Sequence, residues 1–139
     1  MKKIVLLFVS VLSAGLLLTS CNKDDDSSSS ASLEGKWYFS KNGAVVDGNE
    51  FLVDYVNECP TKKDYLEIAS NGTFANVSYL DDCTTTDIFS GTWVRTGDVI
   101  TTTVAGETPE SGTILSLTSS TLKLSFTDVD GTYLVVLTR

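Results

Sequence analysis

Side chains able to perform acid–base or nucleophilic chemistry are scarce in this 139-residue chain. It contains no histidine, so the usual general base near neutral pH is missing. No Gly-x-Ser-x-Gly elbow occurs among its many serines. The neighbouring carboxylates Asp81 and Asp82 could act as an acid and a base, but their place in an expected loop favours solvated side chains. The sequence therefore predicts no catalytic residues and no enzyme activity.

A second candidate for chemistry is Asp128-Val129-Asp130-Gly131, which has the pattern that begins a calcium loop. A full loop needs further oxygen ligands and a Glu at its twelfth position, and Arg139 stands there instead. Asp-Gly is typical of a tight hairpin turn. We therefore expect a turn here, with no metal ion and no cofactor.

The first cysteine closes an N-terminal leader. Lys2 and Lys3 precede an apolar run over residues 4–18, and two small residues follow it, as in a secretory signal. The run is shorter than the roughly 20 residues of a membrane-spanning helix. Leu18-Thr19-Ser20-Cys21 resembles the bacterial lipobox, which implies that residues 1–20 are removed and that Cys21 carries acyl chains such as palmitate. The alternative is a plain signal peptide followed by an unrelated cysteine.

Residues 22–32 are polar and too hydrophilic to be buried, so we expect a disordered tether. Lys23 followed by Asp24, Asp25 and Asp26 resembles the surface-export signal of lipoproteins in some Gram-negative bacteria. That resemblance implies an outer-membrane lipoprotein facing the cell surface. The alternative is a lipoprotein that faces the periplasm.

The charge balance limits the partners. The full chain has a net charge of −8, with 10 basic and 18 acidic residues. Removal of Lys2 and Lys3 leaves 8 basic residues against 18, a net charge of −10. This argues against nucleic acid as a partner and against adhesion to anionic lipid headgroups. We expect residues 33–139 to form one monomeric domain with a single core.

The two remaining cysteines, Cys59 and Cys83, are expected to pair. An exported pair in an oxidising compartment most often forms a disulfide. Their spacing is not C-x-x-C and no histidine could complete a metal site, so a metal or redox pair is the weaker alternative. A bond between them would hold the irregular stretch 42–64 as a lid over one end of the fold.

Short strand-like runs separated by turn residues predict an antiparallel all-β domain. The expected turns are Asn42-Gly43, Asp47-Gly48, Asn71-Gly72, Gly97-Asp98 and Asp130-Gly131. The eight expected strands span residues 35–41, 65–70, 73–80, 87–95, 99–104, 113–117, 121–127 and 132–138. Eight sequential strands suit an up-and-down barrel, because closure removes exposed edges. An open sandwich is the alternative, and residues 50–57 could form a short helix or an extra strand.

Several motifs carry a family resemblance. The domain opens with Leu33-Glu34-Gly35-Lys36-Trp37, and Asn71-Gly72-Thr73-Phe74, Ser90-Gly91-Thr92-Trp93 and Ser119-Ser120-Thr121-Leu122 follow in order. This order resembles the small lipocalin-like domain of bacterial outer-membrane lipoproteins over nearly all of residues 33–139. The resemblance implies a barrel with a Trp near its closed end and a late-strand Arg packed over that Trp, either Arg139 or Arg95. The chain is much shorter than a typical lipocalin, so a large ligand cavity is not implied.

The expected function is non-covalent binding of a small hydrophobic ligand inside the barrel of an envelope lipoprotein. An eight-stranded barrel is just wide enough for its own side chains, so the same residues could simply be core. The alternative function is a structural or protein- or glycan-interaction module with a filled barrel. The candidate ligand-binding residues are Trp37, Phe39, Phe74, Phe89, Trp93, Leu124 and Phe126.

Overall fold

A computed structural model describes residues 31–139. The predicted signal peptide (residues 1–20), the lipidated Cys21 and most of the tether (residues 22–32) lie outside the described residues. Within residues 31–139 no helix is long and apolar enough to cross a membrane. The described chain forms nine antiparallel strands: β1 (Gly35–Val46), β2 (Asn49–Asp54), β3 (Tyr65–Ile68), β4 (Thr73–Tyr79), β5 (Thr86–Thr96), β6 (Val99–Thr103), β7 (Glu110–Leu117), β8 (Thr121–Thr127) and β9 (Thr132–Thr138).

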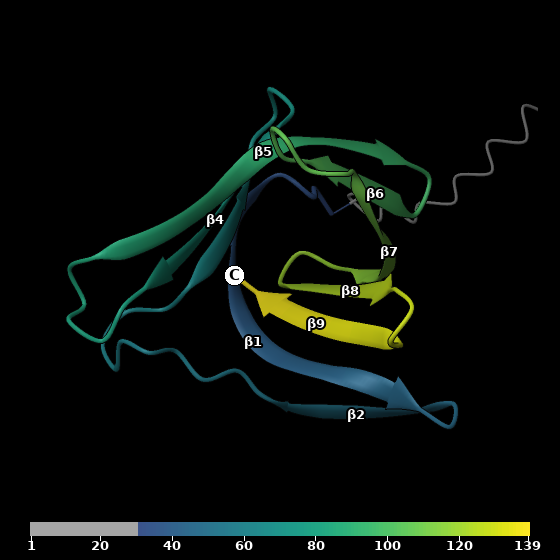
Figure 1. Ribbon diagram of the computed structural model, residues 1–139, viewed down its shortest axis with the longest axis horizontal. Coiled ribbons are helices and arrows are strands. Elements are labelled where there is room, and N and C mark those ends of the chain that lie inside the picture. The colour runs from purple at the N-terminus through teal and green to yellow at the C-terminus, as the bar shows by residue number, and fades with distance from the viewer. Residues whose placement is uncertain (1–30) are drawn as a thin grey trace, which may run out of the picture.

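Eight of these strands close into a barrel. Each strand from β3 to β8 pairs with the next one along the chain, and β1 pairs with both β3 and β9, as Figure 1 shows. Phe39 lies opposite Leu137 at this closing seam. The predicted eight-stranded up-and-down barrel is therefore confirmed over the open sandwich, because every barrel strand has a partner on both sides along part of its length.

One strand, β2, lies outside the barrel. It forms within the irregular stretch 42–64, whose structure the sequence left open. Residues 49–54 form β2, which pairs with the second half of β1 beyond β3. The Asp47-Gly48 turn joins them as predicted, with positive φ angles of 51° and 77°. Lys123 on β8 bonds Glu50 on β2 at 2.5 Å, so β2 reaches the outer surface of the barrel.

The predicted turn at Asn42-Gly43 is wrong, because β1 continues through it to Val46. Gly43 has a different purpose: a Cβ atom there would lie 1.8 Å from the carbonyl oxygen of Phe51 on β2. Glycine is thus required for the close approach of two backbones rather than for a reversal of the chain.

The connection between β3 and β4 also differs from its prediction. We expected a two-residue turn at Asn71-Gly72, but residues 69–72 form a four-residue loop. The N–H of Ala69 donates to the carbonyl of Thr73 at 2.8 Å, and the Asn71 side chain accepts the N–H of Thr73 at 3.1 Å. Asn71 stabilises the wider loop because its amide oxygen substitutes for a backbone acceptor.

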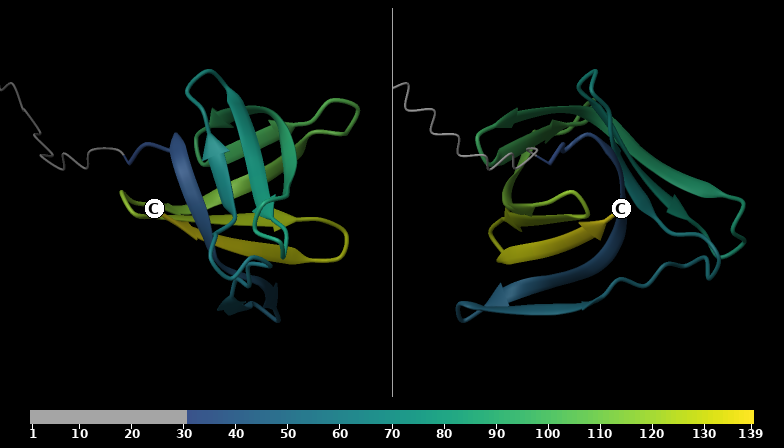
Figure 2. Two further views of the ribbon diagram at one scale, coloured as in Figure 1. Left: turned by 90° about the vertical axis from the view of Figure 1, so that its left-hand side faces the viewer. Right: turned by 180° about the vertical axis from the view of Figure 1, so that it is seen from behind.

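The core fills one end of the barrel, called here the closed end. Strand alternation points one set of side chains inward, and the most buried of them are Trp37, Ile68, Leu122 and Leu137, all at most 1% exposed. Leu33 completes this cluster from the segment before β1. The opposite, open end carries the loops β4–β5, β6–β7 and β8–β9, the last two of which project away from the C-terminus in Figure 2.

Candidate functional site

The candidate site is a cavity of about 240 Å³ inside the barrel, above the packed closed end. Five of the seven predicted ligand-binding residues line it: Phe39, Phe74, Phe89, Leu124 and Phe126. They come from β1, β4, β5 and β8, whose inward positions meet in the lumen. The lining also includes Leu66, Asn76, Ile100, Thr102, Glu110, Val135 and Leu137.

Two glycines lie beside phenylalanine rings that line the cavity. Gly91 lies opposite Phe74 across β4 and β5, and Gly112 lies opposite Phe126 across β7 and β8. At Gly91 a Cβ atom would stand 2.1 Å from the carbonyl oxygen of Thr103 and 3.1 Å from the Phe74 ring. At Gly112 it would stand 2.6 Å from the Phe126 ring. Each ring therefore lies over a cross-strand glycine, an arrangement that stabilises the otherwise bare strand.

The two predicted tryptophans lie elsewhere, and neither lines the cavity. Trp37 is fully buried at the closed end, where its indole N–H donates to the carbonyl of Leu33 at 2.8 Å. The indole N–H of Trp93 donates to the carbonyl of Ala69 at 3.0 Å. Both indoles therefore help to fill the closed end of the barrel, because their N–H groups donate to backbone carbonyls there.

Arg139 is the arginine that packs over the tryptophan. Its guanidinium carbon lies 3.8 Å from the centre of the Trp37 ring, and it also donates to the carbonyl of Ser32. Arg95 instead donates to the carbonyl of Gly97 at 2.7 Å and faces Asp98. The structure therefore selects Arg139 over Arg95, a choice that the sequence left open.

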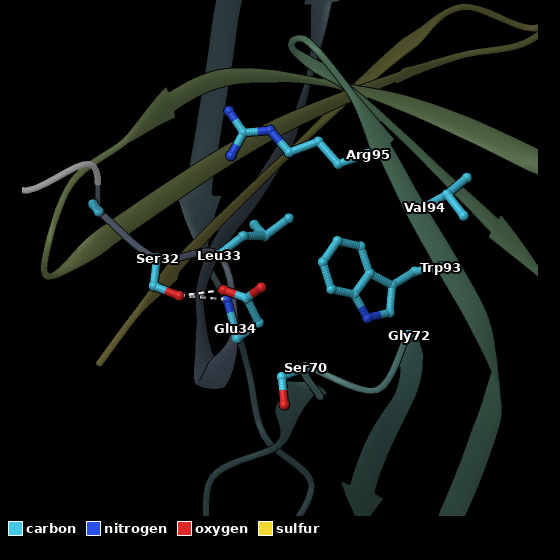
Figure 3. Close-up of a pocket in the computed structure, with 9 residues that line it drawn as sticks. Ser32, Leu33, Glu34, Ser70, Gly72, Trp93, Val94 and Arg95 are labelled. Atoms are coloured by element: carbon cyan, nitrogen blue, oxygen red, sulfur yellow. Dashed lines mark hydrogen bonds between the residues drawn. The ribbon is translucent and has the colours of Figure 1, made fainter.

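A larger depression, about 590 Å³, lies outside the closed end. It is a shallow, open surface between the segment before β1, the β3–β4 loop and the end of β5. Figure 3 shows Leu33 and the Trp93 ring beside it, with Glu34 bonded to Ser32 and Arg95 extending above. Its greater openness to solvent makes it a poorer binding site than the cavity inside the barrel, despite its volume.

The open end is held by a disulfide and a buried carboxylate. The predicted Cys59–Cys83 bond is present and ties the β2–β3 linker, residues 55–64, to the β4–β5 loop. Asp64, 3% exposed, accepts the Tyr55 hydroxyl at 2.7 Å and the Tyr79 N–H at 2.8 Å. No residue of the linker lines the cavity, so the linker braces the wall of the barrel and is not the lid that we expected.

Tyr55 carries the clearest effect of this arrangement on protonation. Partial burial and the Asp64 carboxylate raise the pKa of Tyr55 to about 12, because both disfavour the phenolate. The Tyr55 ring also stacks on Phe39, with centroids 5.0 Å apart. The Asp64 network therefore supports one wall of the cavity directly.

Two polar groups at the cavity have no counterpart in our sequence prediction. The side-chain oxygen of Asn76 is buried and has no hydrogen-bond partner among the described residues. Glu110 begins β7 two positions before the inward Gly112 and lines the cavity from the same face. Inward spacing along each strand is the signal that could have identified both residues.

The carboxylates singled out for chemistry have structural roles. Asp82 accepts the N–H groups of Thr84 and Thr85 and the Thr85 hydroxyl, and these bonds hold the pKa of Asp82 well below its usual range. Asp128 accepts the N–H groups of Asp130 and Gly131, which is the predicted turn. Within residues 31–139 no group of three or more acidic, Cys or His side chains is arranged to hold a metal ion.

Comparison with known proteins agrees with this architecture. The family model described as a lipocalin-like domain matches residues 33–124, about two thirds of the chain. The chain therefore belongs to the lipocalin-like domain family, as its motif order predicts.

Two solved structures are similar to this chain at low sequence identity, and the first of them shares its fold. An uncharacterized protein from Bacteroides eggerthii is 15% identical, with a TM-score of 0.56, covering 78% of this chain and 100% of its own. A deswapped triple mutant of the bovine odorant binding protein is 12% identical, with a TM-score of 0.41, covering 76% and 72%. No curated protein sequence matches the chain.

Proposed function

We propose that this chain is a lipid-anchored envelope protein that binds a small hydrophobic ligand non-covalently in its barrel and performs no catalysis. The observation that carries the binding proposal is the partly open cavity of about 240 Å³ lined by four phenylalanines and by aliphatic side chains. Burial of apolar surface contributes about 25 cal/mol per Å², so a small apolar molecule could bind here without any chemical step. The volume is below the roughly 300–1,000 Å³ typical of ligand pockets, which restricts the ligand to a small molecule.

The binding proposal is tested with the chain purified from its own envelope. Native mass spectrometry should detect a co-purifying small molecule whose mass is lost on unfolding. Thr102→Phe and Val135→Phe each add a ring to the cavity from a different strand, and both should abolish that mass while the purified variants remain folded by circular dichroism. Retention of the same molecule by both folded variants would place it outside the cavity and overturn the proposal.

The anchoring proposal rests on Leu18-Thr19-Ser20-Cys21. Attachment at Cys21 is consistent with the fold because Ser32 and Leu33 lie at the closed end, beside Arg139 and Trp37. The tether of residues 22–32 could span at most about 40 Å when fully extended. The open end would then be directed away from the membrane, towards the medium that carries a ligand.

Two measurements test the anchor and its orientation. Cys21→Ala should release the protein from the membrane fraction. The wild type should incorporate labelled palmitate, and the Cys21→Ala variant should not. Protease treatment of intact cells should remove the domain if it faces the surface. Protection until the outer membrane is opened would instead establish the periplasm-facing alternative.

A second candidate function is an interaction module of the envelope. Among the strands of residues 31–139, β2 has no partner on one edge, and it exposes Phe51 and Val53, which are 58% and 63% accessible. An exposed apolar edge strand is a common docking surface for an extended segment of another protein. If β2 docks another envelope protein, the double variant Phe51→Ser and Val53→Ser should no longer form chemical crosslinks to that protein. Binding of a ligand in the cavity should be unchanged.

A further inference from the structure

We propose that the ligand of the barrel is a small amine with a compact aromatic or hydrocarbon body, and that the site rejects carboxylates such as fatty acids. This inference rests on the proposed binding function and names the chemical class of the ligand. It is carried by the charged and polar groups that the fold places in the cavity and around its mouth.

The first observation is the charge of the cavity itself. Glu110 is the only ionisable residue that lines it, and no Lys or Arg contributes to the lining. Among the ion pairs formed within residues 31–139, none includes Glu110. A carboxylate at the mouth of an apolar cavity favours an incoming ammonium group and repels an anion. Glu110 is exposed to solvent, so both effects are weakened by salt.

The second observation is the buried oxygen of Asn76. The Asn76 side chain lines a cavity otherwise formed mainly by apolar side chains, and its buried oxygen has no partner within the described chain. A rotation of the Asn76 amide would present this oxygen to a ligand, and a donated hydrogen bond would then offset the roughly 1–3 kcal/mol that an unsatisfied buried acceptor costs. An ammonium group donates up to three hydrogen bonds, whereas a carboxylate donates none.

The third observation is the acidity of the open end. The strand ends and loops at the open end contain eight further acidic residues that are exposed to solvent, besides the buried Asp64. Lys62 and Lys63 are basic residues of the same loops. A mouth lined by one sign of charge raises the local concentration of the opposite ion. The acidic residues are Asp47, Glu58, Asp81, Asp82, Asp87, Glu107, Asp128 and Asp130.

The fourth observation concerns the body of the ligand. The ring centres of Phe74 and Phe89 lie 6.1 Å apart, and the ring planes are tilted by 56° to each other. Both rings line one side of the cavity of about 240 Å³. Aromatic faces attract cations by about 0.5–2 kcal/mol depending on desolvation. The combination of a small volume, phenylalanine walls and acceptors favours a single-ring amine over a long acyl chain.

The test uses three probes of matched shape: 3-phenylpropylamine, 3-phenylpropan-1-ol and 3-phenylpropanoate. Each is titrated into the full chain in non-ionic detergent by calorimetry, with the detergent alone as the blank. We expect the amine to bind at least tenfold more tightly than the acid at low salt, with the alcohol between them. The difference between amine and acid should shrink at high salt, because the acidic loops at the mouth are screened.

Variants assign the effect to the cavity. Glu110→Gln should weaken amine binding about five- to tenfold and leave the alcohol unchanged. Asn76→Leu should weaken both the amine and the alcohol. Glu67→Gln, which removes the same charge from the exposed outer face of β3, should change neither affinity.

The outcomes separate this inference from the function beneath it. Binding of the acid as tightly as the amine, blocked by Thr102→Phe, would overturn the ligand class and leave the cavity as a binding site. Amine binding unaffected by both Glu110→Gln and Asn76→Leu would also overturn it. Failure of all three probes to bind the folded protein would count against the ligand class and the binding function together.

Discussion

The Tyr55 hydroxyl donates a hydrogen bond of 2.7 Å to the buried carboxylate of Asp64. The same carboxylate accepts the Tyr79 N–H. The backbone N–H of Asp64 donates to the side-chain oxygen of Asn57, and the backbone carbonyl of Asp64 accepts the N–H of Phe39. Asp64 therefore joins three parts of the chain: its side chain holds the β2–β3 linker and the end of β4, and its backbone carbonyl holds β1. This relationship explains how an irregular linker is held against a barrel that closes without it.

Loss of the Asp64 carboxylate should be costly. Asp64→Ala leaves the Tyr55 hydroxyl and the Tyr79 N–H without their acceptor, so we expect a loss of about 2–4 kcal/mol in the free energy of unfolding. Asp64→Asn retains an oxygen and should lose less. Urea denaturation measures both, and an Asp64→Ala variant within 0.5 kcal/mol of the wild type, in the range of a neutral surface change, would contradict the role of this carboxylate.

The stability of the protein should fall in alkali because of Tyr55. Its pKa is raised to about 12 in the folded protein and is about 10 in an unfolded chain. The unfolded state therefore loses its proton first, so this contribution is complete below pH 10 and is lost as the pH rises towards 12. Absorbance at 295 nm should show one late-titrating tyrosine that Tyr55→Phe removes, and the variant should lose less stability than the wild type between pH 9 and pH 11.

Arg139 should stabilise the closed end through Trp37. Arg139→Ala removes the guanidinium 3.8 Å from the ring centre and should lower the free energy of unfolding by about 1 kcal/mol. It should also change the Trp fluorescence. Arg95→Ala is the matched control, because its pair with Asp98 at 3.9 Å lies at the surface and contributes about 0–1 kcal/mol. Equal effects of the two variants on the free energy of unfolding would contradict the prediction that Arg139 stabilises the protein through Trp37.

The Cys59–Cys83 bond closes a loop with a sequence separation of 24. Cys59→Ala with Cys83→Ala should therefore cost about 3 kcal/mol on the chain-entropy account. In the oxidised wild type, thiol-reactive reagents should label neither cysteine before reduction. The barrel should still form in the double variant, because the eight strands pair independently of the linker. Loss of all strand signal in circular dichroism would show that the bond is needed for the fold itself.

The sequence alone predicted the parts of this protein that depend on local order. Alternation in runs such as Leu122-Lys123-Leu124 identified inward and outward positions, because the period of a strand is set by neighbouring residues. It also identified the cysteine pair and the family. Local turn chemistry was less reliable: Asn42-Gly43 lies within β1, since a glycine needed for close approach and one needed for a turn look the same in sequence.

The tertiary structure decided what depends on contacts between distant residues. Arg139, not Arg95, covers Trp37 only because β9 ends beside the start of β1. The cavity is lined by the Phe74 and Phe126 rings, which lie over glycines on neighbouring strands, and by Glu110 and Asn76 from β7 and β4. Strand pairing brings these residues together over separations that no local pattern encodes, so only the closed barrel places the polar groups on which the proposed choice of ligand depends.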